Sequence, residues 1–266
     1  GAIGSRVGAG GPVSRRARQV LIGGAATATV AATAAVVWVF ALADSARPVS
    51  VDDAVGRYRE RAAGGSTPAP AGVYVYETRG EEWVSALGGA RHAYPAESAI
   101  TVAAHACGMT LTWDVLEERS SAYTVCVEDG ELTLPSWRER HRFFGRDDES
   151  EWRCRETAWL PADPAGASLP YRCASDETVQ EGELTVVGVE SVTVGGESVE
   201  AIRLRIEATE TGAAEGTLLE ERWLEPATGL PLRVEYRVAT DNESLIGDVR
   251  FEERYELTLT SLEPRT

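Results

Sequence analysis

Four cysteines are the residues of this 266-residue sequence whose type and spacing most clearly predict chemistry. They are Cys107, Cys126, Cys154 and Cys173, and the first two and the last two are each 19 positions apart. An even number of cysteines in an exported domain predicts two disulfides, for which three connectivities are possible. We favour Cys107–Cys126 and Cys154–Cys173, because each would close a local loop, worth roughly 3 kcal/mol in the chain-entropy model.

The alternative interpretation of the cysteines is a metal site that includes His105, two residues before Cys107. The sequence has no C-x-x-C spacing, and oxidising surroundings disfavour the free thiolates that a metal ion would need. The other two histidines, His92 and His141, lie in different expected elements, and no nucleophile motif accompanies them. We therefore expect no catalytic residue, no metal ligand and no cofactor, and we do not expect an enzyme.

The densest acidic run is Asp147-Asp148-Glu149-Ser150-Glu151, whose oxygens could bind calcium. It lacks the glycine-punctuated order of a calcium-binding loop, so we predict a solvated loop. The formal charge of the chain is −16, and the acids concentrate in its exported part. Such a surface repels phosphate backbones, which excludes nucleic acid as an expected partner.

An uncharged stretch at residues 20–43 predicts where the rest of the chain resides. It is longer than the roughly 20 residues needed to cross a bilayer, and arginines precede it. We interpret residues 1–19 as a cytoplasmic tail and residues 20–43 as a transmembrane signal anchor, which gives a single-pass protein in the cell membrane. The alternative is a secreted domain, released by cleavage following Ala43, because Ala41-Leu42-Ala43 has the form of a signal-peptidase site.

Residues 44–72 predict a short stalk helix followed by a Gly/Pro linker. Ser50-Val51-Asp52-Asp53 resembles a capping box, and an apolar stripe at helical spacing follows it. The stretch from Gly64 to Gly72 would interrupt either a helix or a sheet. The stripe permits the helix to remain a stalk or to dock on the domain that follows.

Residues 73–266 form the expected extracytoplasmic β-domain, because their apolar residues recur with a period of two. The clearest strands are expected near residues 184–194, 198–209, 216–225, 230–239 and 248–260. Weaker strand patterns occupy residues 73–78, 99–103, 109–116, 122–127, 141–145 and 152–160. The expected fold class is mainly β: a large antiparallel up-and-down meander, incurved into a half-barrel, preceded by one N-terminal transmembrane helix and the stalk helix.

A sheet with one apolar face must cover that face. If no helix layer does so, the sheet must curl, and a curled sheet can enclose an apolar groove for a lipid or another hydrophobic ligand. The alternative is that the tryptophans of the domain pack a closed core. The candidate groove residues are Trp113, Trp223, Leu232, Val234, Tyr236, Phe251 and Tyr255.

Several segments between residues 73 and 264 resemble known envelope proteins. Gly72-Val73-Tyr74-Val75-Tyr76-Glu77-Thr78, Arg91-His92-Ala93-Tyr94-Pro95 and Ala106-Cys107-Gly108 resemble uncharacterised actinobacterial membrane-anchored proteins. Trp223-Leu224-Glu225-Pro226-Ala227-Thr228-Gly229-Leu230-Pro231-Leu232-Arg233 is similar to the strand-turn-strand of LolA-like lipoprotein carriers and RseB-type envelope sensors. This resemblance implies an incurved antiparallel half-barrel with a hydrophobic ligand cavity. The anchor and the disulfides depart from soluble carriers and favour a tethered sensor or lipid-binding module.

The expected function is therefore a non-enzymatic, membrane-anchored domain that binds a hydrophobic ligand, either a lipid or a lipoprotein, or senses the state of the envelope. The alternative is a structural or protein-interaction module of the cell envelope, with a closed core and no ligand. A sheet filled by its own side chains would favour the alternative.

Overall fold

We describe the protein from a computed structural model, which describes residues 44–61, 67–162, 166–243 and 247–266. The expected cytoplasmic tail and the expected transmembrane segment, residues 1–19 and 20–43, lie outside the described residues. In the ranges that are described, no helix has both the length and the apolar character needed to cross a membrane.

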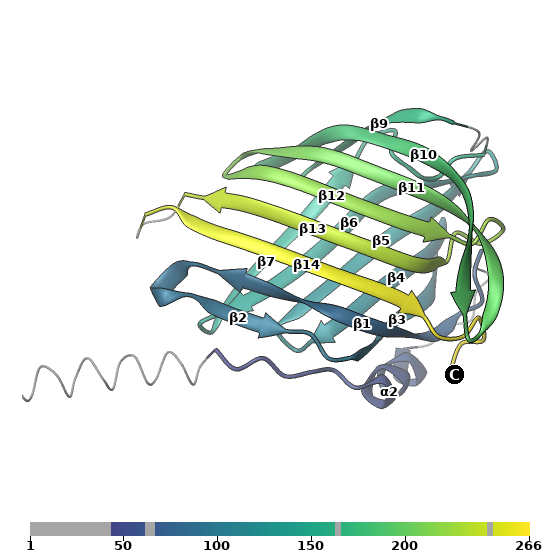
Figure 1. The fold of residues 1–266 in the computed structure, drawn as a ribbon, viewed down its shortest axis with the longest axis horizontal. Coiled ribbons are helices and arrows are strands. Elements are labelled where there is room, and N and C mark those ends of the chain that lie inside the picture. The colour runs from purple at the N-terminus through teal and green to yellow at the C-terminus, as the bar shows by residue number, and fades with distance from the viewer. Residues whose placement is uncertain (1–43, 62–66, 163–165, 244–246) are drawn as a thin grey trace, which may run out of the picture. The chain divides into compact units, whose positions relative to one another are not determined.

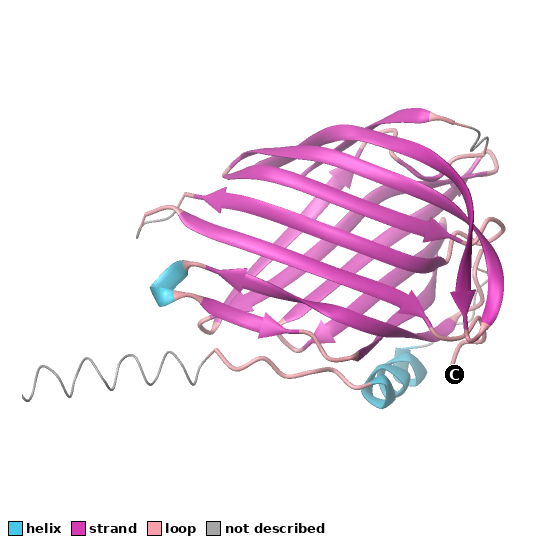
Figure 2. Cartoon of the chain, in the orientation of Figure 1, coloured by secondary structure: helices cyan, strands magenta, loops and turns pink. Residues whose placement is uncertain are grey.

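Antiparallel strands make up most of the described chain (Figures 1 and 2). The strands are β1 (Gly72–Val84), β2 (Ala90–Ala93), β3 (Glu97–His105), β4 (Gly108–Leu116), β5 (Arg119–Glu128), β6 (Glu131–Phe143), β7 (Arg146–Cys154), β8 (Ala158–Leu160), β9 (Ser168–Ala174), β10 (Thr178–Val194), β11 (Glu197–Gly212), β12 (Ala214–Leu224), β13 (Pro231–Asn242) and β14 (Val249–Leu259). A 3₁₀ turn, η1 (Ala86–Gly88), joins β1 to β2. The mainly β, antiparallel meander predicted from the sequence is confirmed.

The sheet closes into a barrel, which goes beyond the expected half-barrel. Among the described residues, 12 strands complete the ring, while β2 pairs with β1 and β8 pairs with β6 beside it. Closure comes from the first and last strands, because β1 pairs with β14 from Tyr76 opposite Leu259 to Val84 opposite Phe251. Pairing these two strands removes the free edges that an open sheet would expose.

The seam between β7 and β9 is the shortest pairing around this ring. Only Arg153 opposite Ala174 and Cys154 opposite Cys173 are paired there. The two cysteines of that register position form a disulfide, so a covalent bond reinforces the seam.

The acidic run that we predicted as a solvated loop is instead part of strand β7, so that prediction was wrong. Its residues pair with the arginine-rich end of β6, where Arg142 lies opposite Asp147 and Arg138 opposite Glu151. Opposite charges facing each other across two strands favour their pairing. The four acidic side chains of the run nevertheless remain exposed, whereas the serine among them, Ser150, is half-buried.

Helix α2 (Val51–Arg61) begins where the capping box predicted. The hydroxyl of Ser50 accepts a hydrogen bond of 3.1 Å from the backbone N–H of Asp53 and donates one of 2.6 Å to its carboxylate. Val51, Ala54 and Val55 of the helix pack against an apolar patch on β1 and β3 (Figure 1). The helix therefore docks on the barrel, one of the two arrangements that its stripe permitted.

Inward-facing side chains fill the barrel. A single cluster of buried apolar residues extends from β1 to β14 and includes five tryptophans: Trp113, Trp137, Trp152, Trp159 and Trp223. Trp137 and Trp152 stack inside it with their rings 5.1 Å apart. Such packing leaves little space between the inner faces of the strands.

Candidate functional site

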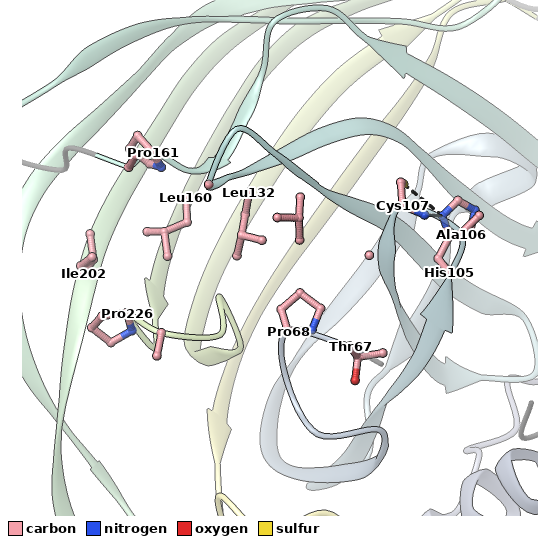
Figure 3. A pocket seen from close by; sticks show the side chains of 15 residues that line it. Thr67, Pro68, His105, Ala106, Cys107, Leu132, Leu160, Pro161, Ile202 and Pro226 are labelled. Atoms are coloured by element: carbon pink, nitrogen blue, oxygen red, sulfur yellow. Dashed lines mark hydrogen bonds between the residues drawn. The ribbon is translucent and has the colours of Figure 1, made fainter. Parts of the chain in front are cut away.

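A recess of about 780 Å³ lies at one end of the barrel (Figure 3). The turns β3–β4, β5–β6 and β12–β13 surround it, together with the segment after β8 and the chain before β1. Fifteen described residues line this recess, and none of them is an acid, a lysine or an arginine. Ten of the fifteen are apolar: Pro68, Ala106, Val127, Leu132, Leu160, Pro161, Ala162, Ile202, Pro226 and Ala227. We call this end the recess end.

The β12–β13 turn forms a rigid wall of the recess. The carboxylate of Glu225 accepts hydrogen bonds from the backbone N–H of Thr228 at 2.7 Å and from its hydroxyl at 2.6 Å. Gly229 has a φ of +68°, and a Cβ there would lie 2.4 Å from Leu132. Trp159 donates a hydrogen bond of 2.9 Å to the carbonyl of Gly229. The Glu-Pro-Ala-Thr-Gly sequence thus fixes both the shape of this turn and its attachment to β8.

A small void lies between described residues of the barrel interior. It measures about 30 Å³ and is lined by residues that include Trp113, Tyr123 and Tyr255. Ser121 Oγ and Arg222 Nη1, which belong to residues of this lining, have no hydrogen-bond partner among the described residues. A space of this size with two polar atoms suits one water molecule rather than a ligand.

Most of the seven candidate groove residues pack inside the barrel. Trp113, Val234 and Tyr255 line the small void, and Leu232 is fully buried. Tyr236 stacks on Tyr255 with the ring centroids 4.8 Å apart. These five residues therefore lie on one inner face, and three of them line the small void.

Phe251 and Trp223 lie apart from the other five. Phe251 is half-buried and meets the ring of His141 edge-on at 4.9 Å, near the end of the barrel opposite the recess. Trp223 pairs with Arg203 and Arg233 on the neighbouring strands, and each guanidinium lies 4.9 Å from its ring. The indole N–H donates to Glu190 at 2.9 Å. Trp223 is buried within the apolar cluster, yet its ring lies among charged side chains.

The end opposite the recess contains a cluster of buried charges, which we call the charged end. Its members are Glu82, His92, Arg119, Glu139, His141 and Glu253. Glu82 is fully buried and its two carboxylate oxygens contact His92 Nδ1 at 2.8 Å and His141 Nδ1 at 2.6 Å. The other ring nitrogen of His141 lies 3.3 Å from Glu139. Carboxylates at both ring nitrogens favour a doubly protonated, cationic imidazole.

The ionisation of these groups follows from their contacts. Burial alone would raise the pKa of Glu82, but hydrogen bonds from His141 and His92 outweigh it and lower the pKa to about 2. Burial and the nearby Arg119 oppose protonation of His141, yet its hydrogen bonds to Glu139 and Glu82 raise its pKa to about 9. Glu82 and His141 are therefore an ion pair at neutral pH.

Arg119 and Glu253 form a second buried pair at the same end. The guanidinium donates to the two carboxylate oxygens at 2.9 and 3.1 Å, and Tyr94 donates a further hydrogen bond to Glu253. Both partners are about 2% exposed. A bidentate pair of this kind satisfies the charges internally and leaves them no free capacity for a ligand.

Three further charged side chains, Arg222, Glu220 and Glu210, are buried outside this cluster. Arg222 pairs with Glu220 two residues away, at 2.6 and 2.7 Å, and its guanidinium lies 4.3 Å from the ring of Trp159. Glu210 is buried beside Gln180, which donates a hydrogen bond of 2.7 Å to it. Burial outweighs that hydrogen bond and raises the pKa of Glu210 to about 7.

Both predicted disulfides, Cys107–Cys126 and Cys154–Cys173, are present, so the favoured connectivity is confirmed. His105, Cys107 and Cys126 are the described residues that come closest to a metal-ligand set, with donor atoms within 4.8 Å of one another. Both sulfurs are bonded to each other and offer no thiolate to a metal ion. This geometry supports the disulfide interpretation over the metal site.

For two of the buried charged residues, the sequence pattern itself indicates that the side chains face the interior. The alternation in β12 places Glu220 and Arg222 in the same phase as the apolar Leu218 and Leu224, and all four are buried. The contact between Glu82 and His141 has no such local signal, because 59 positions separate them in the sequence.

No family model matches the chain, and no curated protein matches it. Among solved structures, it is similar to the crystal structure of the hypothetical lipoprotein YmcC from Escherichia coli (K12), with 13% sequence identity and a TM-score of 0.32. That comparison covers 78% of this chain and 96% of the YmcC chain. A TM-score this low carries no argument, and the resemblance to LolA-like and RseB-type proteins stays a prediction.

Proposed function

We propose that the chain is a non-enzymatic, membrane-anchored extracytoplasmic barrel whose recess binds the apolar chain of a lipid or lipoprotein. The observation that carries this proposal is the recess of about 780 Å³ whose described lining residues include no charged side chain. Charged residues make up 26% of the whole sequence, so a lining of this size would ordinarily include several. The recess volume is also within the range of about 300–1,000 Å³ typical of small-molecule sites.

The proposed position of the ligand, in the recess, differs from the position that the strand pattern predicted, which is a groove along the inner face of the sheet. The inner faces of the strands leave about 30 Å³, so an acyl chain between them would have to displace packed side chains. The recess requires no such rearrangement. Its walls are turns fixed by their own hydrogen bonds, which supports a largely pre-formed site.

The compartment is part of the same proposal. Two disulfides are typical of proteins outside the cytoplasm, where thiols are oxidised. The proposed anchor is residues 20–43, with the N-terminus in the cytoplasm. Carbonate extraction and N-terminal sequencing test it: a membrane-retained chain supports the anchor, whereas a soluble chain that begins at Asp44 supports cleavage after Ala43.

Native mass spectrometry of the full chain, extracted from membranes, tests ligand binding. We expect a lipid-mass adduct that is lost in Ala227→Arg, because Ala227 is exposed on the recess wall and an arginine there would introduce a charge. Ala93→Arg is the matched control, since Ala93 is an exposed alanine of β2 at the other end of the barrel. The control separates lipid held in the recess from lipid that adheres to the anchor.

The second candidate function is a structural or protein-interaction module of the cell envelope. The nearly filled interior of the barrel favours it, because a closed core needs no ligand. Equal adducts in both arginine variants would contradict binding in the recess. Recovery of the wild-type chain with no lipid mass and with a bound envelope protein would support the second candidate instead.

A further inference from the structure

Cys107, which forms a disulfide with Cys126, lies on the wall of the recess (Figure 3). Cys107 is exposed in the tight turn between β3 and β4, whereas Cys126 is buried on β5 opposite Gly108. His105, at the end of β3, places Nδ1 3.2 Å from Cys107 Sγ. An exposed sulfur beside an imidazole is the arrangement that favours a reactive cysteine.

The Cys154–Cys173 disulfide provides an internal comparison. Each bridge spans 19 positions, so both constrain the unfolded chain to the same extent in the chain-entropy model. Cys173 has no exposed surface and Cys154 is only half-exposed, and both sit in the paired seam of β7 and β9. Thiol–disulfide exchange depends on access to the attacked sulfur, so equal loops do not imply equal reactivity.

We propose that Cys107–Cys126 is an exchangeable disulfide that a dithiol reductant opens at Cys107 Sγ, with His105 stabilising the thiolate of Cys107 when it is released. Cys154–Cys173 is the structural disulfide of the barrel. This assignment does not depend on a ligand in the recess, because it rests on the exposure of Cys107 and on its contact with His105.

The exchange proceeds in two steps. A thiolate of the dithiol attacks Cys107 Sγ, a mixed disulfide forms, and the bond to Cys126 breaks with its electron pair on the Cys126 sulfur, which takes a proton from water. The second thiol of the reductant loses its proton to water. The resulting thiolate attacks the first sulfur of the same reductant molecule, which is bonded to Cys107 in the mixed disulfide, and Cys107 is released as a thiolate. The reductant leaves as a cyclic disulfide, so two electrons pass from it to the cysteine pair.

His105 acts on the second step. Nδ1 of His105 also accepts a long hydrogen bond of 3.5 Å from the backbone N–H of Cys107. When Cys107 departs as a thiolate, the tautomer of His105 with its proton on Nδ1 exchanges that bond for one donated to the sulfur, 3.2 Å away. A stabilised leaving thiolate departs faster, so His105 shortens the lifetime of the mixed disulfide. It is a positioning residue for this exchange rather than a nucleophile.

Timed reduction of the folded full chain with dithiothreitol tests the assignment, with free thiols alkylated and mapped by peptide mass spectrometry. We expect Cys107 and Cys126 to be alkylated at least about tenfold faster than Cys154 and Cys173. The difference should vanish in denaturant, where exposure is equal. Similar rates for the two pairs in the folded chain would overturn the proposal.

Glutathione, a monothiol, identifies the attacked sulfur and the role of His105. We expect the trapped mixed disulfide on Cys107, and a trapped adduct on Cys126 would contradict the mechanism. His105→Ala should lengthen the lifetime of the dithiothreitol adduct severalfold without changing its site. Ala106→Ser, in the same turn, should leave that lifetime unchanged, and an equal effect of both substitutions would remove His105 from the mechanism.

Discussion

Strands β5 and β6 run between the two ends of the barrel, and their side chains show how differently these ends are built. At the charged end, Arg119 of β5 and His141 of β6 lie among buried carboxylates. At the recess end, the same two strands contribute Val127 and Leu132 to a hollow with no charged side chain among its described lining. One end satisfies its polar groups internally, and the other presents uncharged side chains and turn backbone to solvent.

The comparison indicates where this barrel can accept a ligand. Each carboxylate of the charged end has cationic or hydrogen-bonding partners within the barrel, so an incoming group would have to replace contacts that are already made. The described lining of the recess has no acid, lysine or arginine whose ion pair a ligand would break, and its apolar side chains gain free energy when a ligand covers them. The middle of the barrel, nearly filled by aromatic rings, separates the two ends.

Removing one partner of the Arg119–Glu253 pair should have the largest effect on the charged end. Glu253→Ala leaves a buried guanidinium without its bidentate partner, which should lower the free energy of unfolding by about 3–5 kcal/mol. Urea unfolding of the full chain measures this loss. Arg254→Ala, next in sequence but exposed, should change it by less than about 1 kcal/mol, and a similar loss in both variants would contradict the importance of the buried pair.

The ion pair of Glu82 and His141 should make stability depend on pH above neutrality. The pKa of His141 is about 9 in the folded chain and about 6.5 when unfolded, so its contribution is complete below pH 6.5 and is lost as the pH rises through 9. We expect the wild type to lose a few kcal/mol relative to His141→Gln between pH 6.5 and pH 9.5. Parallel stability curves over that range would contradict the raised pKa.

Glu210 is a buried acid outside the charged end, and its hydrogen-bond donor is the amide of Gln180 rather than a cation. Its pKa of about 7 lies above that of an unfolded glutamate, so folding favours the protonated form and stability falls as the pH rises through 7. Glu210→Gln should therefore stabilise the chain at pH 8 by on the order of 2 kcal/mol and have little effect at pH 4. Thermal unfolding at the two pH values measures the difference, and a stabilisation that is equal at both would contradict this explanation.

The local pattern of the sequence predicted the strands well, because alternation depends only on neighbouring residues. It could not predict closure, since the pairing of β1 with β14 joins the two ends of the domain. The same limit applies to the groove residues. Trp223 is apolar like its neighbours in the sequence, yet its register opposite Arg203 and Arg233 places charged guanidinium groups against its ring. The prediction of a solvated loop at the acidic run was wrong because this run pairs with the arginines of β6, which are not its neighbours in the local sequence pattern.

The recess was not predictable for a related reason. Its lining comes from turns that are far apart in the sequence, and each contributes only one to a few apolar residues. No single segment carries an apolar pattern that would indicate a site there. Two of its turns, Ala106-Cys107-Gly108 and the β12–β13 turn, belong to the segments on which the predicted resemblance rests, and both line the recess.

The smallest effect on stability is expected from placing one carboxylate at an exposed position of each end in turn. The two variants test whether only the recess end binds the ligand. Val127 is 50% exposed at the recess end, and Leu87 is 59% exposed in the turn between β1 and β2 at the charged end. Val127→Asp and Leu87→Asp should each change the free energy of unfolding by less than about 0.5 kcal/mol, because neither side chain is buried. Only Val127→Asp should lose the lipid adduct in native mass spectrometry, since a carboxylate there would need to remain hydrated where the ligand lies. Retention of lipid by Val127→Asp, with the fold unchanged by circular dichroism, would mean that the apolar recess is not where this barrel holds a ligand.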